Sequence, residues 1–200
     1  MSQNVIGPVS AACLFEYLIS PTCPLERLIL KSADVDDFEC ENFVKAIREN
    51  RSLIELDLSS NLIGKAENLN TVMPELTTGA EALADLLRMP ECKIKTLRLD
   101  WNMIRLDGAI DLANSIASNQ TLTFLDLSYN SLATGGGITL GVSLLENTTL
   151  ETLILQNNNL DSVACITICA GIIENRGLKK VYLDGNPIGD FTHFYFSSLN

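Results

Sequence analysis

The stretch LTFLDLSYNSL, residues 122–132, decides the fold because its leucine frame recurs along the chain. Aliphatic residues stand three and five positions after each start of the frame, and an asparagine stands eight positions after it, except that Ala33 takes that place in the first copy. The copies start at Leu25, Leu53, Ile94, Leu122, Leu150 and Leu178. The step in residue number from one start to the next is 28, except that it is 41 from Leu53 to Ile94. A fixed period of this size predicts a solenoid.

Each unit is expected to hold one short strand and one helix. The apolar pattern of Leu122, Leu125 and Leu127 predicts a strand, and strands of successive units would stack into a parallel sheet. The asparagine at the ninth position, Asn130 in this unit, is expected to bond to backbone groups of the turn and to stabilise the bend of the next repeat. The following helix would bury one face, made by Ala109, Leu112, Ala113 and Ile116 in the third unit.

Two further features of the helical segments lead to predictions. Small residues in the segments 137–147 and 163–175 are expected to let these helices sit close to the sheet. An asparagine stands three residues before four of the frames and is expected to end the helix in a left-handed turn. These residues are Asn50, Asn119, Asn147 and Asn175. The first three lie in N-glycosylation sequons, but the repeat itself accounts for the position.

Residues 1–200 are predicted to form a single repeat domain, because repeat units of this length leave no room for a second one. Residues 1–24 would form a capping helix over the N-terminal edge, with Ala12, Phe15 and Ile19 facing inward. The surplus of the second unit predicts an insertion at about residues 64–79. Helical spacing of Leu69, Val72, Met73 and Leu76 favours a short amphipathic turn there, which either contributes contacts or is a tolerated surface loop.

Composition narrows the classes of function. A net charge of −11 argues against binding to nucleic acid or to an anionic membrane. The apolar run from Val5 to Ile19 contains Glu16 and is too short to span a bilayer. The six cysteines show no zinc-type pairs and favour free thiols in a reducing cytoplasm. The acidic residues between Val35 and Glu41 fit the start of a helix better than a calcium loop, so no metal and no cofactor is expected.

The side chains between the frame leucines are expected to form columns on the exposed face of the sheet. The third and fourth repeats place Trp101, Tyr129 and Phe124 beside Arg98 and Asp126, and exposed aromatic residues with arginine are typical of binding hot spots. The predicted protein-binding residues are Asp57, Arg98, Trp101, Phe124, Asp126, Tyr129, Ile154 and Tyr182. The alternative is that Asp57, Arg98 and Asp126 form a ladder of ion pairs and the aromatic rings merely cover the sheet.

The frame LxxLxLxxNxL, its constant period and the helix pattern GAxxLAxxL resemble leucine-rich repeats of the ribonuclease-inhibitor type over roughly residues 8–190. The resemblance implies an α/β horseshoe with a parallel sheet on the concave side and helices on the convex side. Ribonuclease inhibitor, the Ran GTPase-activating protein, NOD-like receptors and tropomodulin share this fold but no single activity.

The sequence thus favours a non-catalytic scaffold that binds a protein partner through its concave face. The lone histidine, His193, leaves no Ser/His/Asp or Cys/His set, and the chain has no GxxxxGK[ST] phosphate loop. Two alternatives stay open: a GTPase-activating or regulatory protein of the Ran GTPase-activating type, and a structural subunit of a larger cytoskeletal or ciliary assembly. The expected location is the cytoplasm, with the cytoskeleton or a cilium as its specific site under the second alternative.

Overall fold

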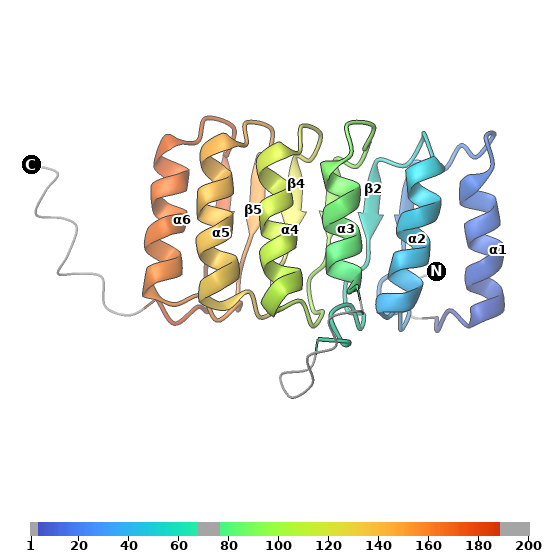
Figure 1. The fold of residues 1–200 in the computed structure, drawn as a ribbon, viewed down its shortest axis with the longest axis horizontal. Helices are drawn as coiled ribbons and strands as arrows, with labels where there is room; N and C mark the ends of the chain where they lie inside the picture. Colours follow the sequence, from blue (N-terminus) through green and yellow to red (C-terminus); the bar gives the residue numbers. More distant parts are fainter. Residues whose placement is uncertain (1–3, 68–76, 189–200) are drawn as a thin grey trace, which may run out of the picture.

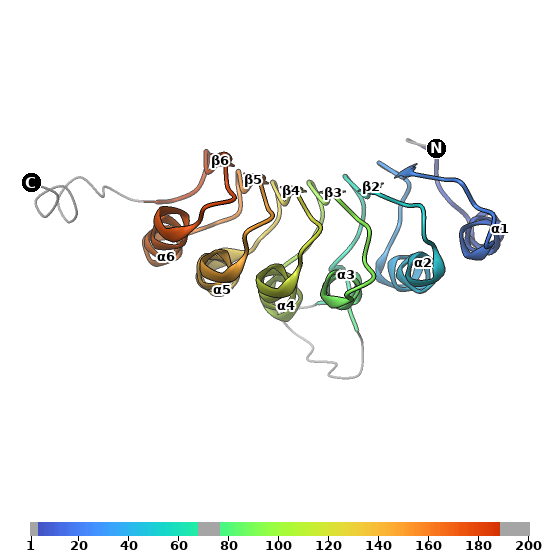
Figure 2. The same ribbon diagram turned by 90° about the horizontal axis from the view of Figure 1, so that it is seen from above.

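The computed structural model describes residues 4–67 and 77–188 and shows one row of strands beside one row of helices (Figures 1 and 2). The strands, each of three residues, are β1 (Arg27–Ile29), β2 (Glu55–Asp57), β3 (Thr96–Arg98), β4 (Phe124–Asp126), β5 (Thr152–Ile154) and β6 (Lys180–Tyr182). The helices are α1 (Pro8–Ile19), α2 (Asp37–Glu49), α3 (Gly79–Arg88), α4 (Leu106–Ser118), α5 (Ala133–Glu146) and α6 (Ser162–Glu174).

The strands form one parallel sheet in the order β1-β2-β3-β4-β5-β6. Equivalent positions of successive repeats are paired, so that Leu97, Leu125 and Leu153 lie side by side. The sheet lines the concave side of a gentle arc and the helices form its convex side (Figure 2). The predicted fold class, a leucine-rich repeat solenoid, is therefore confirmed.

The core lies between the sheet and the helices, where the frame leucines meet the inward faces of the helices. Leu97, Leu125 and Leu153 are fully or almost fully buried, as are Leu112 and Ile116 of α4. The predicted inward face of α4 is therefore correct.

The predicted inward face of α1 is wrong by one residue. Ala11 and Leu18 are buried, whereas Ala12 and Ile19 are exposed. The connection from α1 to β1 contains two prolines and is longer than the connection from α4 to β4, which shifts the inward face. Phe15, the third predicted residue, does face inward, since its ring meets the ring of Phe43 edge to face.

The asparagines at the ninth position tie repeats together in the direction opposite to the one predicted. Asn130 donates to Leu127 O in its own turn, and it also donates to Leu99 O and accepts from Ile104 N in the preceding repeat. The distances are 2.9–3.0 Å. Each such asparagine therefore stabilises the turn of the repeat before it, because the stacked backbone leaves these groups without ladder partners.

The asparagines that end the helices do not adopt the predicted left-handed turn. Asn147 has φ −74° and ψ 133°, which is extended, and its equivalents Asn50, Asn119 and Asn175 are alike. Its carboxamide donates to Ile116 O and Asn119 O of the preceding repeat and accepts from Leu150 N. The side chain closes the helix end, so no glycine-like backbone is needed.

Small residues bring α5 and α6 close to each other rather than to the sheet, which corrects the prediction. A Cβ added at Gly141 would lie 2.5 Å from Thr167 C and 2.6 Å from Thr167 O of the neighbouring helix. A Cβ at Gly137 would lie 2.5 Å from Ala164 Cβ. The two helix backbones therefore approach each other at positions where a larger residue has no room.

Two acidic residues, Asp37 and Glu67, organise the base from which the insertion leaves the array, and Glu67 accepts hydrogen bonds from Arg105 and from Gly108 N of α4. Asp37 of α2 accepts hydrogen bonds from Gly64 N, Ala66 N and Gly79 N at 2.7–2.8 Å. Its neighbour Asp36 caps α2, which agrees with the helix-start interpretation of this acidic stretch. The predicted amphipathic turn at residues 69–76 and the aromatic segment that holds His193 lie outside the described residues. Among the described helices, none is long and apolar enough to cross a membrane.

The cysteines are free thiols, of which Cys13 and Cys169 are exposed and the other four are buried. Burial raises the pKa of the Cys40 thiol well above its usual range and also raises the pKa of the Cys92 and Cys165 thiols. We therefore expect two thiols to react quickly with a thiol reagent such as DTNB at pH 8, and the other four only after the protein is unfolded. A third fast thiol in the native protein would contradict the packing described here.

Candidate functional site

The concave face carries six of the eight predicted side chains in two aligned columns. Arg98 of β3 is paired in register with Asp57 of β2 on one side and with Asp126 of β4 on the other. The same column continues through Ile154 of β5 to Tyr182 of β6. Phe124 stands in the adjacent column between Thr96 and Thr152. The parallel register thus brings residues from five repeats onto one surface.

Trp101 and Tyr129, which follow β3 and β4, form a stacked pair at the end of these strands. Their ring centroids are 4.0 Å apart and the ring planes differ by 9°. The two residues remain 57% and 40% exposed despite the stacking. The structure therefore presents a flat aromatic surface to solvent, as a binding hot spot requires.

The backbone at this pair is unfavourable for large side chains. Both residues have φ 56°, in the left-handed region, and the same position has φ 53° at Asn157 and φ 73° at Gly185. Asparagine and glycine tolerate this conformation, whereas other residues lose roughly 1–2 kcal/mol in it. The conformation belongs to the repeat turn, because Ser32 and Ser60 share it in the first two repeats, but the turn does not require an aromatic side chain at this position.

Arg98 lies over the ring of Phe124, with the guanidinium carbon 4.4 Å from the ring centroid. In the part of the chain that the structure describes, no ion pair within 4.0 Å joins Arg98 to Asp57 or Asp126. The direct ion pairs of the predicted ladder are therefore not formed there, although the charge of Arg98 partly offsets the burial that raises the pKa of the Asp126 carboxyl. The cation–π contact holds the guanidinium against the Phe124 ring.

Asp126 is only 8% exposed and receives two hydrogen bonds from Ser128, from the backbone N at 3.0 Å and from the hydroxyl at 2.6 Å. Burial raises the pKa of the Asp126 carboxyl, the Ser128 bonds act in the opposite direction, and the smaller effects of the Asp100 charge and the Arg98 charge raise and lower it respectively. A buried carboxylate with a like charge nearby is costly for the fold. Asp57 instead accepts from Ser59 N at 2.9 Å and is half-buried.

A groove lies beside this cluster, over β4, β5 and β6. It is lined by Phe124, Thr152, Ile154, Gln156, Lys180 and Tyr182. Three of these were predicted, and Phe124 is shared with the Arg98 contact. The eight predicted residues therefore lie on one face as an aromatic pair, a cation–π pair, two aspartates and part of an apolar groove.

The repeats of this chain are similar in sequence to those of known proteins. A family model described as Leucine Rich repeat matches residues 49–66, 118–141 and 146–169. NACHT, LRR and PYD domains-containing protein 2 of Homo sapiens is 33% identical over 128 residues, which cover 64% of this chain and 11% of that protein. Ribonuclease inhibitor of Sus scrofa is 32% identical over 127 residues, which cover 64% of this chain and 25% of that protein.

The chain is a leucine-rich repeat protein of the ribonuclease-inhibitor type.

This leucine-rich repeat protein spans between about a tenth and a quarter of the length of these relatives. A solved structure titled Leiomodin-1 Actin-Binding Site 2 (ABS2) aligns with a TM-score of 0.52 and 15% identity, covering 96% of this chain and 82% of that one. At this identity the likeness shows the fold alone. The concave site is therefore argued from the residues of the leucine-rich repeat protein itself.

Three residues that line the groove were not among the binding residues predicted from the sequence. Thr152, Gln156 and Lys180 line it together with predicted residues. Thr152 and Lys180 belong to the column of Phe124, so the columns held the signal. Their polar side chains did not indicate a binding role, because the prediction of binding residues was based on aromatic and charged pairs in the central repeats.

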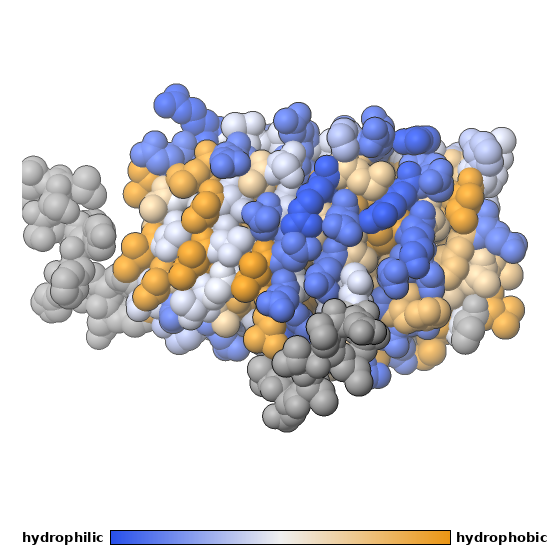
Figure 3. Space-filling view, in the orientation of Figure 1, coloured by the Kyte–Doolittle hydropathy of each residue, from blue (hydrophilic) through white to orange (hydrophobic). Residues whose placement is uncertain are grey.

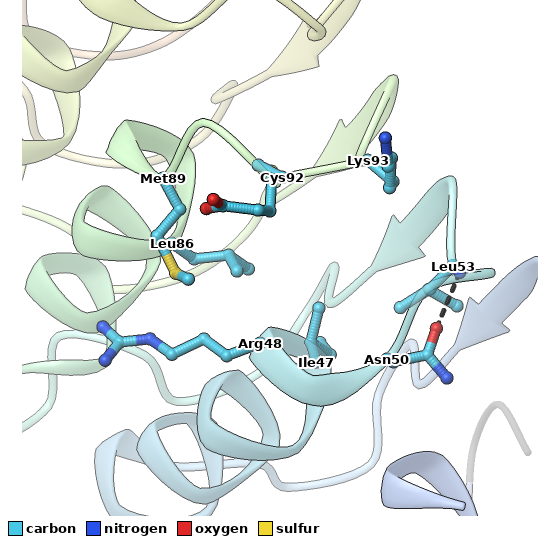
Figure 4. A pocket seen from close by; sticks show the side chains of 9 residues that line it. Ile47, Arg48, Asn50, Leu53, Leu86, Met89, Cys92 and Lys93 are labelled. Atoms are coloured by element: carbon cyan, nitrogen blue, oxygen red, sulfur yellow. Dashed lines mark hydrogen bonds between the residues drawn. The ribbon is translucent and has the colours of Figure 1, made fainter. Parts of the chain in front are cut away.

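A second, small pocket of the leucine-rich repeat protein lies between the ends of α2 and α3 (Figure 4). Its walls include Ile47, Leu86, Met89 and Cys92, and the Asn50 carboxamide accepts from Leu53 N at 2.8 Å. Burial raises the pKa of the Cys92 thiol, which keeps it protonated and unreactive. The pocket's volume of about 10 Å³ leaves room for no more than a single water molecule.

Proposed function

We propose that this protein is a non-catalytic recognition scaffold that binds a protein partner through its concave face. The exposed, stacked pair of Trp101 and Tyr129 in left-handed backbone supports the proposal most strongly. Arg98 on Phe124 and the groove at Ile154 and Tyr182 extend the same surface. A cytoplasmic location and a place in a larger complex belong to this proposal.

The first test replaces both aromatic residues by asparagine, the residue that the fifth repeat places in the same backbone. We expect Trp101→Asn with Tyr129→Asn to weaken partner binding by about 1,000-fold, because two hot-spot residues at about 2 kcal/mol each contribute about 4 kcal/mol. Thermal stability should stay the same or rise, since asparagine fits a positive φ. The measurement compares proteins enriched from the source cell by wild-type and variant baits, followed by direct titration of the enriched partner.

Tyr17→Ala on α1 is the matched control, because Tyr17 is also an exposed aromatic residue, 46% exposed, but lies on a helix. The control should leave capture unchanged. Equal capture by the double variant and the wild type would refute the concave site.

The second test exploits the cost of burying Asp126. We expect Asp126→Asn to raise the urea midpoint at pH 7, because it removes a charge from a buried position and keeps an oxygen for Ser128. Because the pKa of this carboxyl is raised, only its ionised form destabilises the folded protein. The loss of stability therefore appears at pH values above the ordinary pKa of 3.8. The difference between variant and wild type should therefore vanish near pH 3.

The same substitution should weaken partner binding, since a group kept at a cost to stability is retained for function. Asp57→Asn is the matched control for stability, because Asp57 is more exposed and should change the midpoint little. A lower midpoint of Asp126→Asn at pH 7 would show that the ionised carboxylate stabilises the fold instead.

Regulation of a small GTPase and a structural role in a cytoskeletal or ciliary assembly stay predictions. Single-turnover GTP hydrolysis with a panel of small GTPases tests the first, and co-sedimentation with filaments tests the second. If this protein accelerates GTP hydrolysis, GTPase regulation becomes its function and the proposal of a non-catalytic scaffold is rejected.

A further inference from the structure

The convex face changes along its length, with apolar regions at the α1 end and over α5 and α6 and a hydrophilic region between them (Figure 3). Over α2, α3 and α4 it is hydrophilic, and ion pairs join Lys45 to Glu41 and Arg88 to Asp85. Over α5 and α6 it is hydrophobic. The exposed aliphatic side chains of this region are Val142 and Leu145 on α5, Val163, Ile166 and Ile173 on α6, and Ile110 on the edge of α4.

The outer faces of α5 and α6 are not needed for the core. Leu140, Leu144, Ala164 and Ile168 already fill the inward faces and are fully buried. Val142 and Ile173, in contrast, are 51% and 78% exposed. A helix that is apolar on both sides is ordinarily covered on both sides.

The exposed residues form two seams with the spacing of a helical interface. On α6, Val163, Ile166, Ala170 and Ile173 stand at i, i+3, i+7 and i+10, as the a and d positions of a heptad do. On α5 the seam runs through Ile138, Val142 and Leu145. Because the glycine contacts bring α5 and α6 close together, the two seams lie next to each other. Their arrangement fits one further helix laid along them.

The charges around this surface select the kind of helix. The only charged residues on α5 and α6, both of which the structure describes in full, are Glu146 and Glu174 at the helix ends where the seams stop, and both are exposed. Asp161 lies at the opposite end of α6, and the basic Arg176 stands in the turn after Glu174. Across the residues that the structure describes, neither Glu146 nor Glu174 forms an ion pair.

We propose that the convex face of α5 and α6 binds an amphipathic α-helix of a protein partner, with apolar residues at heptad spacing and basic residues flanking them. The apolar seams supply the contact area and the acidic ends select basic flanks. A second copy of this chain offers no basic residue on its own α5 and α6 to pair with these acidic ends, and an anionic membrane would repel them. This surface is separate from the concave site, so either proposal can be refuted without affecting the other.

The test uses a synthetic peptide of about three heptads with leucine at a and d and lysine at the flanking positions. Its twin carries glutamate in place of lysine. Fluorescence anisotropy with the full chain should show binding of the lysine peptide at least tenfold tighter than that of the glutamate peptide. The convex variant, Val142→Ser with Ile166→Ser and Ile173→Ser, should weaken binding of the lysine peptide at least tenfold.

A concave variant, Ile154→Ser with Tyr182→Ser, is the matched control and should bind the lysine peptide like the wild type. Circular dichroism checks that each variant is folded, which is expected because the replaced side chains are not in the core. Equal binding of both peptides, or binding insensitive to the convex variant, would overturn the proposal. So would a wild-type dimer, or binding to zwitterionic vesicles, that the convex variant abolishes, because the occupant would then be a second copy or a lipid surface.

Discussion

Asn130→Ala is expected to lower the free energy of unfolding by about 3 kcal/mol. The asparagine is 6% exposed and its carboxamide bonds to Leu99 O, Leu127 O, Ser128 O and Ile104 N. Alanine leaves these buried backbone groups without this partner, and each lost bond to a buried group costs about 1–3 kcal/mol before the surroundings relax. The loss falls on two repeats, because the bonded groups belong to both.

Urea unfolding followed by circular dichroism measures this effect. Asn114→Ala is the matched control, because Asn114 is exposed on α4 and alanine favours a helix by a few tenths of a kcal/mol. Asn130→Asp tests the mechanism, since a carboxylate can still accept from Ile104 N but cannot donate to three carbonyl groups. A small loss, similar to that of the control, would mean that water replaces the carboxamide in the turn.

Gly141→Ala is expected to destabilise the protein by about 3 kcal/mol. The new Cβ would lie 2.5–2.7 Å from backbone atoms of Thr167 and Ile168. Backbone atoms of a neighbouring helix cannot rotate away, so α5 and α6 must separate along their length. Their separation would also part the two apolar seams, and the variant should bind the lysine peptide more weakly than its loss of stability alone explains.

Gly135→Ala is the control on the same helix. There the new Cβ would meet only the flexible end of Ile110, at 3.3 Å, and alanine should stabilise the helix by about 0.5 kcal/mol. The opposite signs of the two changes separate close packing from helix propensity. Stabilisation by both substitutions would show that α5 and α6 are farther apart in solution.

The leucine frame was sufficient to predict the strands, their parallel order and the side of the core. A constant period leaves one way to stack equivalent leucines such as Leu97, Leu125 and Leu153. The direction of the asparagine bonds was not predictable from the frame, because each turn lies between two repeats and the pattern is the same for both. The inward face of α1 was missed because the length of a connection sets the phase of the helix before it.

The sequence also placed the candidate residues on the concave face but could not show how they meet. The stacking of Trp101 on Tyr129 follows from the register of β3 and β4, which the frame contains. Their left-handed backbone was hidden, since serine, asparagine and glycine at the same position in other repeats looked like ordinary turn residues. Arg98 contacts the Phe124 ring and forms no ion pair with either neighbouring aspartate, and the spacing of residues in the sequence does not predict which contact forms.

The base of the insertion has a practical consequence for engineering. Asp37 fixes Gly64, Ala66 and Gly79 with its two oxygens, and the inserted Glu67 is bonded to Arg105 and Gly108 at the start of α4. The points where the chain leaves and re-enters the array are therefore set by α2 and by Glu67. We expect foreign sequences of varied length to be tolerated if they are grafted between Glu67 and Gly79, because the bonds of Glu67 to α4 are then kept. Replacement of Asp37 would remove that freedom, because the three amides would lose their common acceptor.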